Sequence, residues 1–138
     1  MGNQPLIMVG AAMLILNPQG ELLMMRRTDN GCWGIPGGAM EPGERLEETA
    51  CRETREETGL VVKTLKLLHV FSGPELYYRY PHGAEVHNVT AVYLAADICG
   101  ELALDTGEHS ESGYFPLDAL PEPISPPILP ILKMIREI

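Results

Sequence analysis

A segment in the first half of the chain, residues 38–60, has the periodicity of a helix but carries acid where a helix should be apolar. Seven glutamates fall within it. At about 100° per residue, one helical stripe starts with apolar residues and then turns acidic. Its members are Leu46, Ala50, Glu53 and Glu57. An ordinary amphipathic helix keeps its carboxylates on the opposite face, so this stripe strongly constrains the fold around it.

Carboxylates that continue a core-facing stripe must be desolvated, paired or bound to a cation. Glu53, Glu56 and Glu57 are spaced i, i+3 and i+4, which gathers their oxygens at one end of the helix. Hard divalent cations prefer oxygen ligands of this kind. The spacing therefore indicates a metal site. The alternative is a salt-bridge network within the helix, for example between Arg52 and Glu56.

The residues around the stripe predict where this helix begins and ends. Pro42-Gly43 forms a turn, Glu44 suits the positive N-terminal end, and Gly59 suits the C-terminal cap. We therefore expect one helix from Glu44 to about Thr58. The preceding segment, 33–38, reads as a short strand that runs into a glycine-rich loop, where the backbone can approach an anion or a metal closely.

The same residues resemble the Nudix box, whose pattern is G-x5-E-x7-R-E-U-x-E-E-x-G-U, where U is a bulky aliphatic residue. The matching positions are Gly38, Glu44, Arg52, Glu53, Glu56, Glu57, Gly59 and Leu60. Thr54 departs from the pattern, because it is a half-polar residue at the first U position. So many fixed positions make a specific motif. The box covers residues 38–60, and family-like context extends the resemblance over most of the chain.

The resemblance implies an α/β fold of the Nudix type, an α/β/α sandwich with a mixed β-sheet between helices, in one domain over residues 1–138. It also implies Mg²⁺ or Mn²⁺ as cofactor. The implied metal-site residues are Gly37 or Gly38 through a backbone carbonyl, Glu44, Glu53, Glu56, Glu57 and Glu108. The implied catalytic residues are Arg52, Glu53, Glu56, Glu57 and Glu108. By the same resemblance, Arg52 would brace Glu53 through a bidentate pair, and Glu44 would support the ligands or bind an outer metal.

A further carboxylate, as an added metal ligand or general base, is expected from a loop opposite the helix. Residues 108–115 resemble the later E-x-x-E-x-x-W-F stretch of the family, with Tyr114 in place of the tryptophan. Glu108 is the first choice and Glu111 the second. A base within the box itself, Glu53 or Glu56, stays open.

The substrate is expected to be a small nucleotide. The net charge of −9 makes the chain a poor partner for bare nucleic acid, so a polyphosphate would need local metal ions and arginines. The candidate substrate-binding residues are Arg26, Arg27, Arg79 and Trp33. ADP-ribose, a deoxynucleoside triphosphate and a dinucleoside polyphosphate all remain candidate substrates. Pro74 and the nearby tyrosines match positions that accompany more than one of these substrates in the family.

Other properties of the chain narrow its class. Three widely spaced cysteines without a C-x-x-C motif indicate a reduced, cytoplasmic protein. No run of about 20 apolar residues predicts a membrane span. A homodimer is left open. The resemblance implies a metal-dependent hydrolase that cleaves a diphosphate linkage in a nucleoside diphosphate joined to another group. Two other functions compete with it: a non-catalytic nucleotide sensor on the Nudix fold, and an enzyme like isopentenyl diphosphate isomerase.

The remaining elements follow from turn signals and apolar runs. The expected strands are 7–16, 21–27, 60–71, 75–80, 86–96 and 113–115. Residues 106–111 read as a polar, acidic loop. A second helix should start near Pro127 and bury an apolar face against the core, because Ile128, Leu129, Ile131, Leu132 and Ile135 recur at helical spacing.

Overall fold

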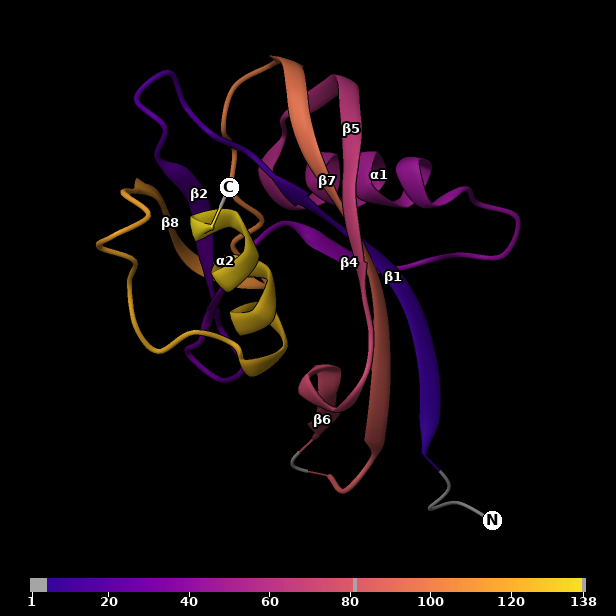
Figure 1. Cartoon of the computed structure of the whole chain (residues 1–138). Helices are drawn as coiled ribbons and strands as arrows, with labels where there is room; N and C mark the ends of the chain where they lie inside the picture. Colours follow the sequence, from indigo (N-terminus) through magenta and orange to yellow (C-terminus); the bar gives the residue numbers. More distant parts are fainter. Residues whose placement is uncertain (1–4, 81, 138) are drawn as a thin grey trace.

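The computed structural model describes residues 5–80 and 82–137, which form two β-sheets and two α-helices (Figure 1). The strands are β1 (Leu6–Leu14), β2 (Leu22–Arg27), β3 (Trp33–Gly34), β4 (Gly37–Ala39), β5 (Val61–Phe71), β6 (Tyr77–Arg79), β7 (Glu85–Cys99) and β8 (His109–Phe115). The helices are α1 (Leu46–Thr58) and α2 (Leu129–Arg136). Short 3₁₀ turns occupy Pro74–Leu76 and Pro126–Ile128.

The larger sheet is mixed and lies between the two helices. Its strand order is β4-β1-β7-β5, with β6 also paired to β7. β1 runs parallel to β7, whereas β4, β5 and β6 pair antiparallel to their neighbours. Alternate residues of β1 face opposite sides: Ala12 packs in one buried cluster with Ile131 of α2, and Ala11 packs in another with Ala50 of α1. This confirms the predicted α/β sandwich.

A second, three-stranded sheet has the order β3-β2-β8. Its central strand, β2, is almost entirely buried from Leu22 to Met25. Because a buried strand must pair its backbone groups on both edges, β2 needs a neighbour on each side. β8 supplies one of them, although its sequence is polar, and the predicted loop 106–111 is therefore wrong from His109 onward. Pairing within the folded chain outweighs local composition here.

Helix α1 begins two residues later than predicted and ends where predicted. The Glu48 carboxylate accepts the Arg45 backbone N–H at 2.7 Å, which caps the first turn and leaves Glu44 outside the helix. At the other end Gly59 has φ 77°, and its N–H donates to the Arg55 carbonyl at 2.9 Å. A left-handed residue at this position favours glycine, which confirms the predicted C-terminal cap.

One further element, a strand, differs from its expected bounds, and another, the C-terminal helix, agrees with the prediction. The expected strand 75–80 starts only at Tyr77, because Pro74 opens a 3₁₀ turn. The C-terminal helix packs on the core as predicted: Ile131 and Leu132 are fully buried, although Leu129 is 51% exposed. No helix in the described ranges is long and apolar enough to cross a membrane.

Thr54, the residue that departs from the box pattern, lies fully buried on the inner side of α1. Its Oγ1 has no hydrogen-bond partner in the part of the chain that the structure describes. A buried, unsatisfied hydroxyl destabilises the folded state. Thr49, one and a half turns earlier, is equally buried, but its Oγ1 donates to Glu44 at 2.7 Å.

We therefore expect Thr54→Val to raise the free energy of unfolding by about 1 kcal/mol, because valine keeps the shape and removes the unpaired hydroxyl. For a chain of this size the melting temperature should rise by roughly 3 to 5 °C. Thr49→Val is the matched control and should lower stability, because its hydroxyl is bonded. Equal destabilisation by both substitutions, measured by thermal unfolding, would show that Thr54 is satisfied.

Candidate metal and substrate site

Helix α1 turns the acidic part of its stripe toward strand β4. Glu57 is only 7% exposed, and the Glu53 side chain is 17% exposed. Glu47 and Glu48 lie exposed on the other face. The predicted orientation of the helix is therefore confirmed, and two carboxylates continue the apolar stripe into the protein.

Two glycines leave room for the atoms that surround β4. A Cβ at Gly38 would overlap the Glu53 carboxylate, and a Cβ at Gly37 would lie 2.6 Å from the Ala11 carbonyl oxygen. A side chain at Gly38 would therefore displace the Glu53 carboxylate, and one at Gly37 would push against the backbone of β1. Gly38 is needed for the contact with Glu53, and Gly37 for the pairing with β1.

The backbone of β4 faces β1 and α1 at alternate residues. Met13 N–H donates to the Pro36 carbonyl, and Met40 N–H donates to the Val9 carbonyl, both at 2.9 Å. The antiparallel register then directs the polar groups of Gly38 toward β1 and those of Gly37 toward α1. Gly37 N–H indeed donates to Glu57 Oε1 at 3.1 Å. Of the two glycine carbonyls considered from the sequence, that of Gly37 lies on the side of Glu57.

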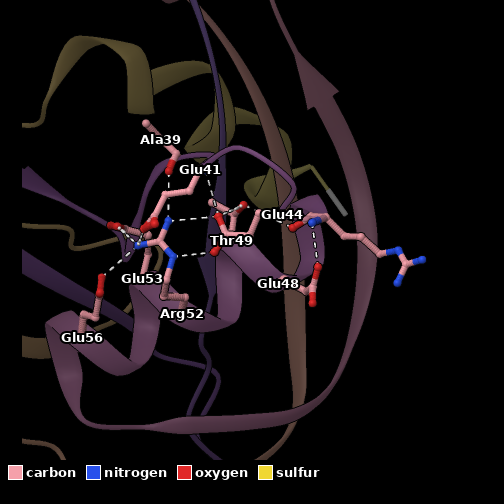
Figure 2. Close-up of polar contacts among 9 residues, drawn as sticks. Ala39, Glu41, Glu44, Glu48, Thr49, Arg52, Glu53 and Glu56 are labelled. Carbon is pink, nitrogen blue, oxygen red and sulfur yellow. Dashed lines mark hydrogen bonds and ion pairs between the residues drawn. The ribbon is translucent and has the colours of Figure 1, made fainter.

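Arg52 lies among several carboxylates (Figure 2). Its Nη1 bonds Glu53 and Glu56, each at 2.9 Å, and its Nη2 donates to the Ala39 carbonyl at 3.1 Å. Two of its nitrogens, Nε and Nη2, bond the two oxygens of Glu44. The bidentate partner of Arg52 is thus Glu44 rather than Glu53, which corrects the predicted pairing. Arg52 ties the loop before α1 to the functional end of the helix.

Glu44 acts as the anchor of this arrangement. Besides Arg52, it accepts hydrogen bonds from Thr49 Oγ1 at 2.7 Å and from the Glu41 N–H at 3.0 Å. The hydrogen bond from Arg52, followed by that from the Glu41 amide, lowers the pKa of Glu44 to about 2. Since its oxygens are committed to protein donors, Glu44 is placed to brace Arg52.

Glu57 has no cationic partner, in contrast to Glu44, Glu53 and Glu56, which all pair with Arg52. Within the described residues, none of the ion pairs involves Glu57. Burial, and after it the nearby charge of Glu53, raises the pKa of Glu57 to about 9, although the Gly37 N–H opposes the shift. Burial also raises the pKa of Glu53. The salt-bridge alternative therefore accounts for Glu53 and Glu56, which pair with Arg52, but leaves the buried Glu57 unexplained.

The predicted metal ligands are brought together only in part. Glu53 and Glu57 are neighbours beside Gly37, but the Glu56 side chain is 51% exposed and ion-paired with Arg52. No three His, Cys, Asp or Glu side chains among residues 5–80 and 82–137 meet closely enough to hold a metal ion. The Glu56 carboxylate is attracted to the positive charge of Arg52, which lies one turn earlier on the same helix.

Glu108 lies in a turn that is hydrogen-bonded to helix α1 and to Thr28, the residue directly after strand β2. Asp105 N–H donates to the Glu57 carbonyl at 3.0 Å, which ties the turn to the end of α1. Thr28 N–H donates to the Glu108 carbonyl at 2.9 Å, and Thr28 Oγ1 reaches the same oxygen at 3.1 Å. The Glu108 charge contributes to the raised pKa of Glu57. Sequence reasoning missed Thr28, because its partners are backbone groups distant in the chain.

Glu111 lies apart from this group. It sits opposite Arg26 in the β2–β8 pairing, and the two side chains form an exposed ion pair at 3.2 Å. Arg26 also donates to the Gly31 carbonyl. Both residues are occupied at the edge of the smaller sheet, so the structure favours Glu108 over Glu111 by position.

A cleft of about 590 Å³ opens beside Glu57 and Gly37. It runs between the two sheets and α2 toward β6, where Tyr78 and Tyr80 line its far end. Arg27 lines the wall, with its guanidinium bonded to Asp29 at 2.9 and 2.8 Å. The cleft therefore joins the acidic end of α1 to an aromatic end.

Three of the four predicted substrate residues lie outside the lining of this cleft. Trp33 is 8% exposed and packs edge-on against Phe115 with ring centroids 5.2 Å apart, so it belongs to the core. Arg26 and Arg79 are also absent from the lining. Arg79 alternates with Tyr78 and Tyr80, which take the cleft side. His109 also lines the cleft. No signal in the sequence points to it, because a single histidine without a partner at metal-binding spacing is usually structural.

The raised pKa of Glu57 predicts how stability depends on pH without metal. In the unfolded chain this carboxyl loses its proton near pH 4.5, whereas in the folded chain it keeps it to about pH 9. The folded state binds the extra proton between these values, so the contribution is full below pH 4.5 and is lost as pH rises toward 9. We expect the melting temperature of metal-free protein to fall over this range.

Glu57→Gln should flatten that dependence, because glutamine stays neutral. Mg²⁺ or Mn²⁺ should raise the melting temperature more at pH 8.5 than at pH 5.5, since a cation must displace the proton. Added EDTA should reverse the increase. A melting temperature that rises steadily from pH 5 to 9 without metal would contradict the proposed buried, protonated pair.

Comparison with known proteins agrees with this geometry. Residues 6–134 match the family described as NUDIX domain. An ADP-ribose pyrophosphatase of Methanocaldococcus jannaschii is 37% identical over 111 residues, covering 78% of this chain and 62% of that protein. The 8-oxo-dGDP phosphatase of Mus musculus is 34% identical over 117 residues, covering 80% and 33%. The chain thus spans less than two thirds of the length of either relative.

A solved structure gives the same result for the fold. The crystal structure of a MutT NUDIX hydrolase from Burkholderia pseudomallei superposes with a TM-score of 0.81 and 32% identity, over 96% of this chain and 98% of that one. The matched region contains the box, the glycine strand and the helix that carries the carboxylates. By its sequence and its fold, this chain is a member of the Nudix family.

Proposed function

We propose that this chain is a metal-dependent hydrolase that cleaves a diphosphate linkage in a nucleoside diphosphate joined to another group. The observation that carries the proposal is the buried carboxyl of Glu57, which lines the cleft, lies beside Glu53 and forms no ion pair among the described residues. Burying a carboxyl in this way is costly unless it serves to bind a cation. Pyrophosphatase and phosphatase relatives support the same reaction class.

The residues present fit a divalent cation. Glu53, Glu57 and the Gly37 carbonyl provide oxygen donors on one side of β4, and Glu56 and Glu108 are the nearest further carboxylates. The Nudix family typically uses a divalent metal, and we propose Mg²⁺ or Mn²⁺. Such a cation neutralises the diphosphate oxygens and lowers the pKa of a bound water.

The protein's own residues orient this site. Arg52, held by Glu44, fixes Glu53 while leaving Glu57 free of any ion pair. We propose Glu108 as the added ligand or general base, because its turn is tied to both α1 and β2. Arg27 would contact phosphate from the cleft wall, close to Asp29.

The far end of the cleft suits a nucleobase. The rings of Tyr78 and Tyr80 lie 4.8 Å apart in an edge-on arrangement, and both line the cleft. Aromatic side chains offer stacking surfaces that accept any base. A nucleoside beside these tyrosines and a diphosphate beside Glu57 would both be accommodated by one cleft of about 590 Å³, so ADP-ribose-like and nucleoside triphosphate substrates are the leading candidates.

A substrate panel separates this proposal from its alternatives. ADP-ribose, 8-oxo-dGTP, dGTP, a dinucleoside polyphosphate and isopentenyl diphosphate would be incubated with Mg²⁺ or Mn²⁺, and the products identified by mass spectrometry. A hydrolase releases phosphate or nucleoside monophosphate. A sensor binds without products, and an isomerase leaves the diphosphate intact.

The three free thiols favour a cytoplasmic location, and a homodimer is left open.

Glu53→Gln and Glu57→Gln should keep the fold but lower kcat by about 100-fold or more, because each removes a charged group at the reacting diphosphate. Glu48→Gln, on the exposed face of the same helix, is the matched control and should retain activity. Turnover within a few-fold of wild type for Glu57→Gln would contradict the metal-ligand assignment.

Glu108→Gln should lower kcat strongly with little change in KM, as expected for a group that acts in the chemical step. Glu111→Gln should be mild, because Glu111 pairs with Arg26 at the sheet edge. The reverse order of effects in steady-state kinetics would transfer the role to Glu111. Two mild variants would assign the base to a box carboxylate.

A further inference from the structure

We infer that His109 is a substrate-binding residue whose imidazole donates a hydrogen bond from Nε2–H to a diphosphate oxygen of the bound nucleotide. This inference rests on the proposed function and extends it to a residue outside the Nudix box. His109 lies at the start of β8 and lines the cleft.

The His109 side chain is buried without being satisfied by the protein. The residue is only 6% exposed, and its Nδ1 is sealed from solvent. Nδ1 has no hydrogen-bond partner in the described part of the chain. About nine in ten buried polar groups in proteins have a partner. A buried imidazole on the wall of a cleft, with no protein partner for its sealed nitrogen, therefore needs an explanation.

The environment of Nδ1 determines which nitrogen carries the proton. Neutral imidazole has one N–H and one unprotonated nitrogen. A sealed N–H without an acceptor would lose a hydrogen bond entirely, and no acceptor lies within reach of Nδ1 in the described residues. The favoured tautomer therefore holds its proton on Nε2. Because Nδ1 is sealed, the ring edge that a ligand can meet is the distal edge, which contains Nε2.

The position of His109 favours the diphosphate over the base. It pairs with Arg27 in the β2–β8 register and directly follows Glu108, whose charge acts on Glu57. Tyr78 and Tyr80 line the same cleft from β6 and the residue just beyond it. His109 thus lies beside the charged groups Arg27 and Glu108, where the diphosphate would lie.

The donors nearest to His109 on the cleft wall are already partly engaged. Arg27 bonds Asp29 through Nε and Nη2, at 2.9 and 2.8 Å, which leaves Nη1 for a phosphate. The Gly37 N–H is bonded to Glu57. The nearby carboxylates repel a phosphate. A neutral N–H at His109 would donate a hydrogen bond to the phosphate, and it would not form an ion pair with those carboxylates.

Three substitutions test this assignment. Glutamine places an N–H close to the position of Nε2, asparagine places one close to Nδ1, and leucine places none. The probe is α,β-methylene-ADP with Mg²⁺, which the enzyme cannot cleave, and binding would be measured by calorimetry. His109→Leu and His109→Asn should weaken binding and lower kcat/KM by about tenfold, the loss of one hydrogen bond to a charged group. His109→Gln should stay within a few-fold of wild type.

Two controls separate binding from folding. Adenosine binding should be unchanged in every variant, because it lacks the diphosphate. The rise in melting temperature caused by Mn²⁺ should also be unchanged, because His109 is not a metal ligand. Wild-type affinity for the analogue in His109→Leu, or equal loss of adenosine binding, would overturn the inference.

The outcome is distinct from that of the proposed function. If the substrate panel yields no hydrolysis but the analogue binds and His109→Leu weakens it, the hydrolase proposal fails and the inference stands. If wild-type protein hydrolyses the panel and all three variants match it, the inference fails alone. Absence of analogue binding to wild-type protein overturns the inference directly.

Discussion

The close approach of helix α1 to strand β4 is the constraint on which the site depends. Gly38 has no side chain, so that the Glu53 carboxylate can lie over it, and Glu57 bonds the amide of Gly37. The approach gives Glu57 a backbone donor and places the Gly37 carbonyl beside it. The proposed metal site, made of side chains and backbone, would then result from packing a helix on an edge strand.

The distribution of positive charge explains why only part of the acidic cluster is neutralised. Arg52 bonds Glu44, Glu53 and Glu56, and these contacts fix the helix end against the loop before it. Glu57 lies deeper and receives one backbone hydrogen bond but no cation. The folded chain therefore keeps a proton on this buried pair at neutral pH, and a divalent cation that replaced the proton would recover the lost electrostatic stabilisation. Under the proposed function, the carboxyl that lowers stability without metal is the one that would bind the cation.

The sequence predicts the helix, its orientation and the paired carboxylates, because these follow from local spacing. The stripe from Leu46 to Glu57 and the cap at Gly59 need no information from distant residues. Contacts between distant segments could not be predicted in the same way. Three features depend on which strand lies next to β2. They are the strand that starts at His109, the hydrogen bond from Thr28 to Glu108, and the burial of Trp33. Arg52 was placed correctly on the helix, but its bidentate partner depends on the loop before α1.

The most direct test of the central claim is a measurement of proton release on metal binding. Mn²⁺ would be titrated into the protein at pH 7 by calorimetry in buffers of different ionisation enthalpy. Because Glu57 holds a proton in the metal-free fold, about one proton should be released for each ion bound, and Glu57→Gln should abolish the release. Metal binding that releases no proton at pH 7 would contradict the account of a buried, protonated carboxyl pair as the metal site.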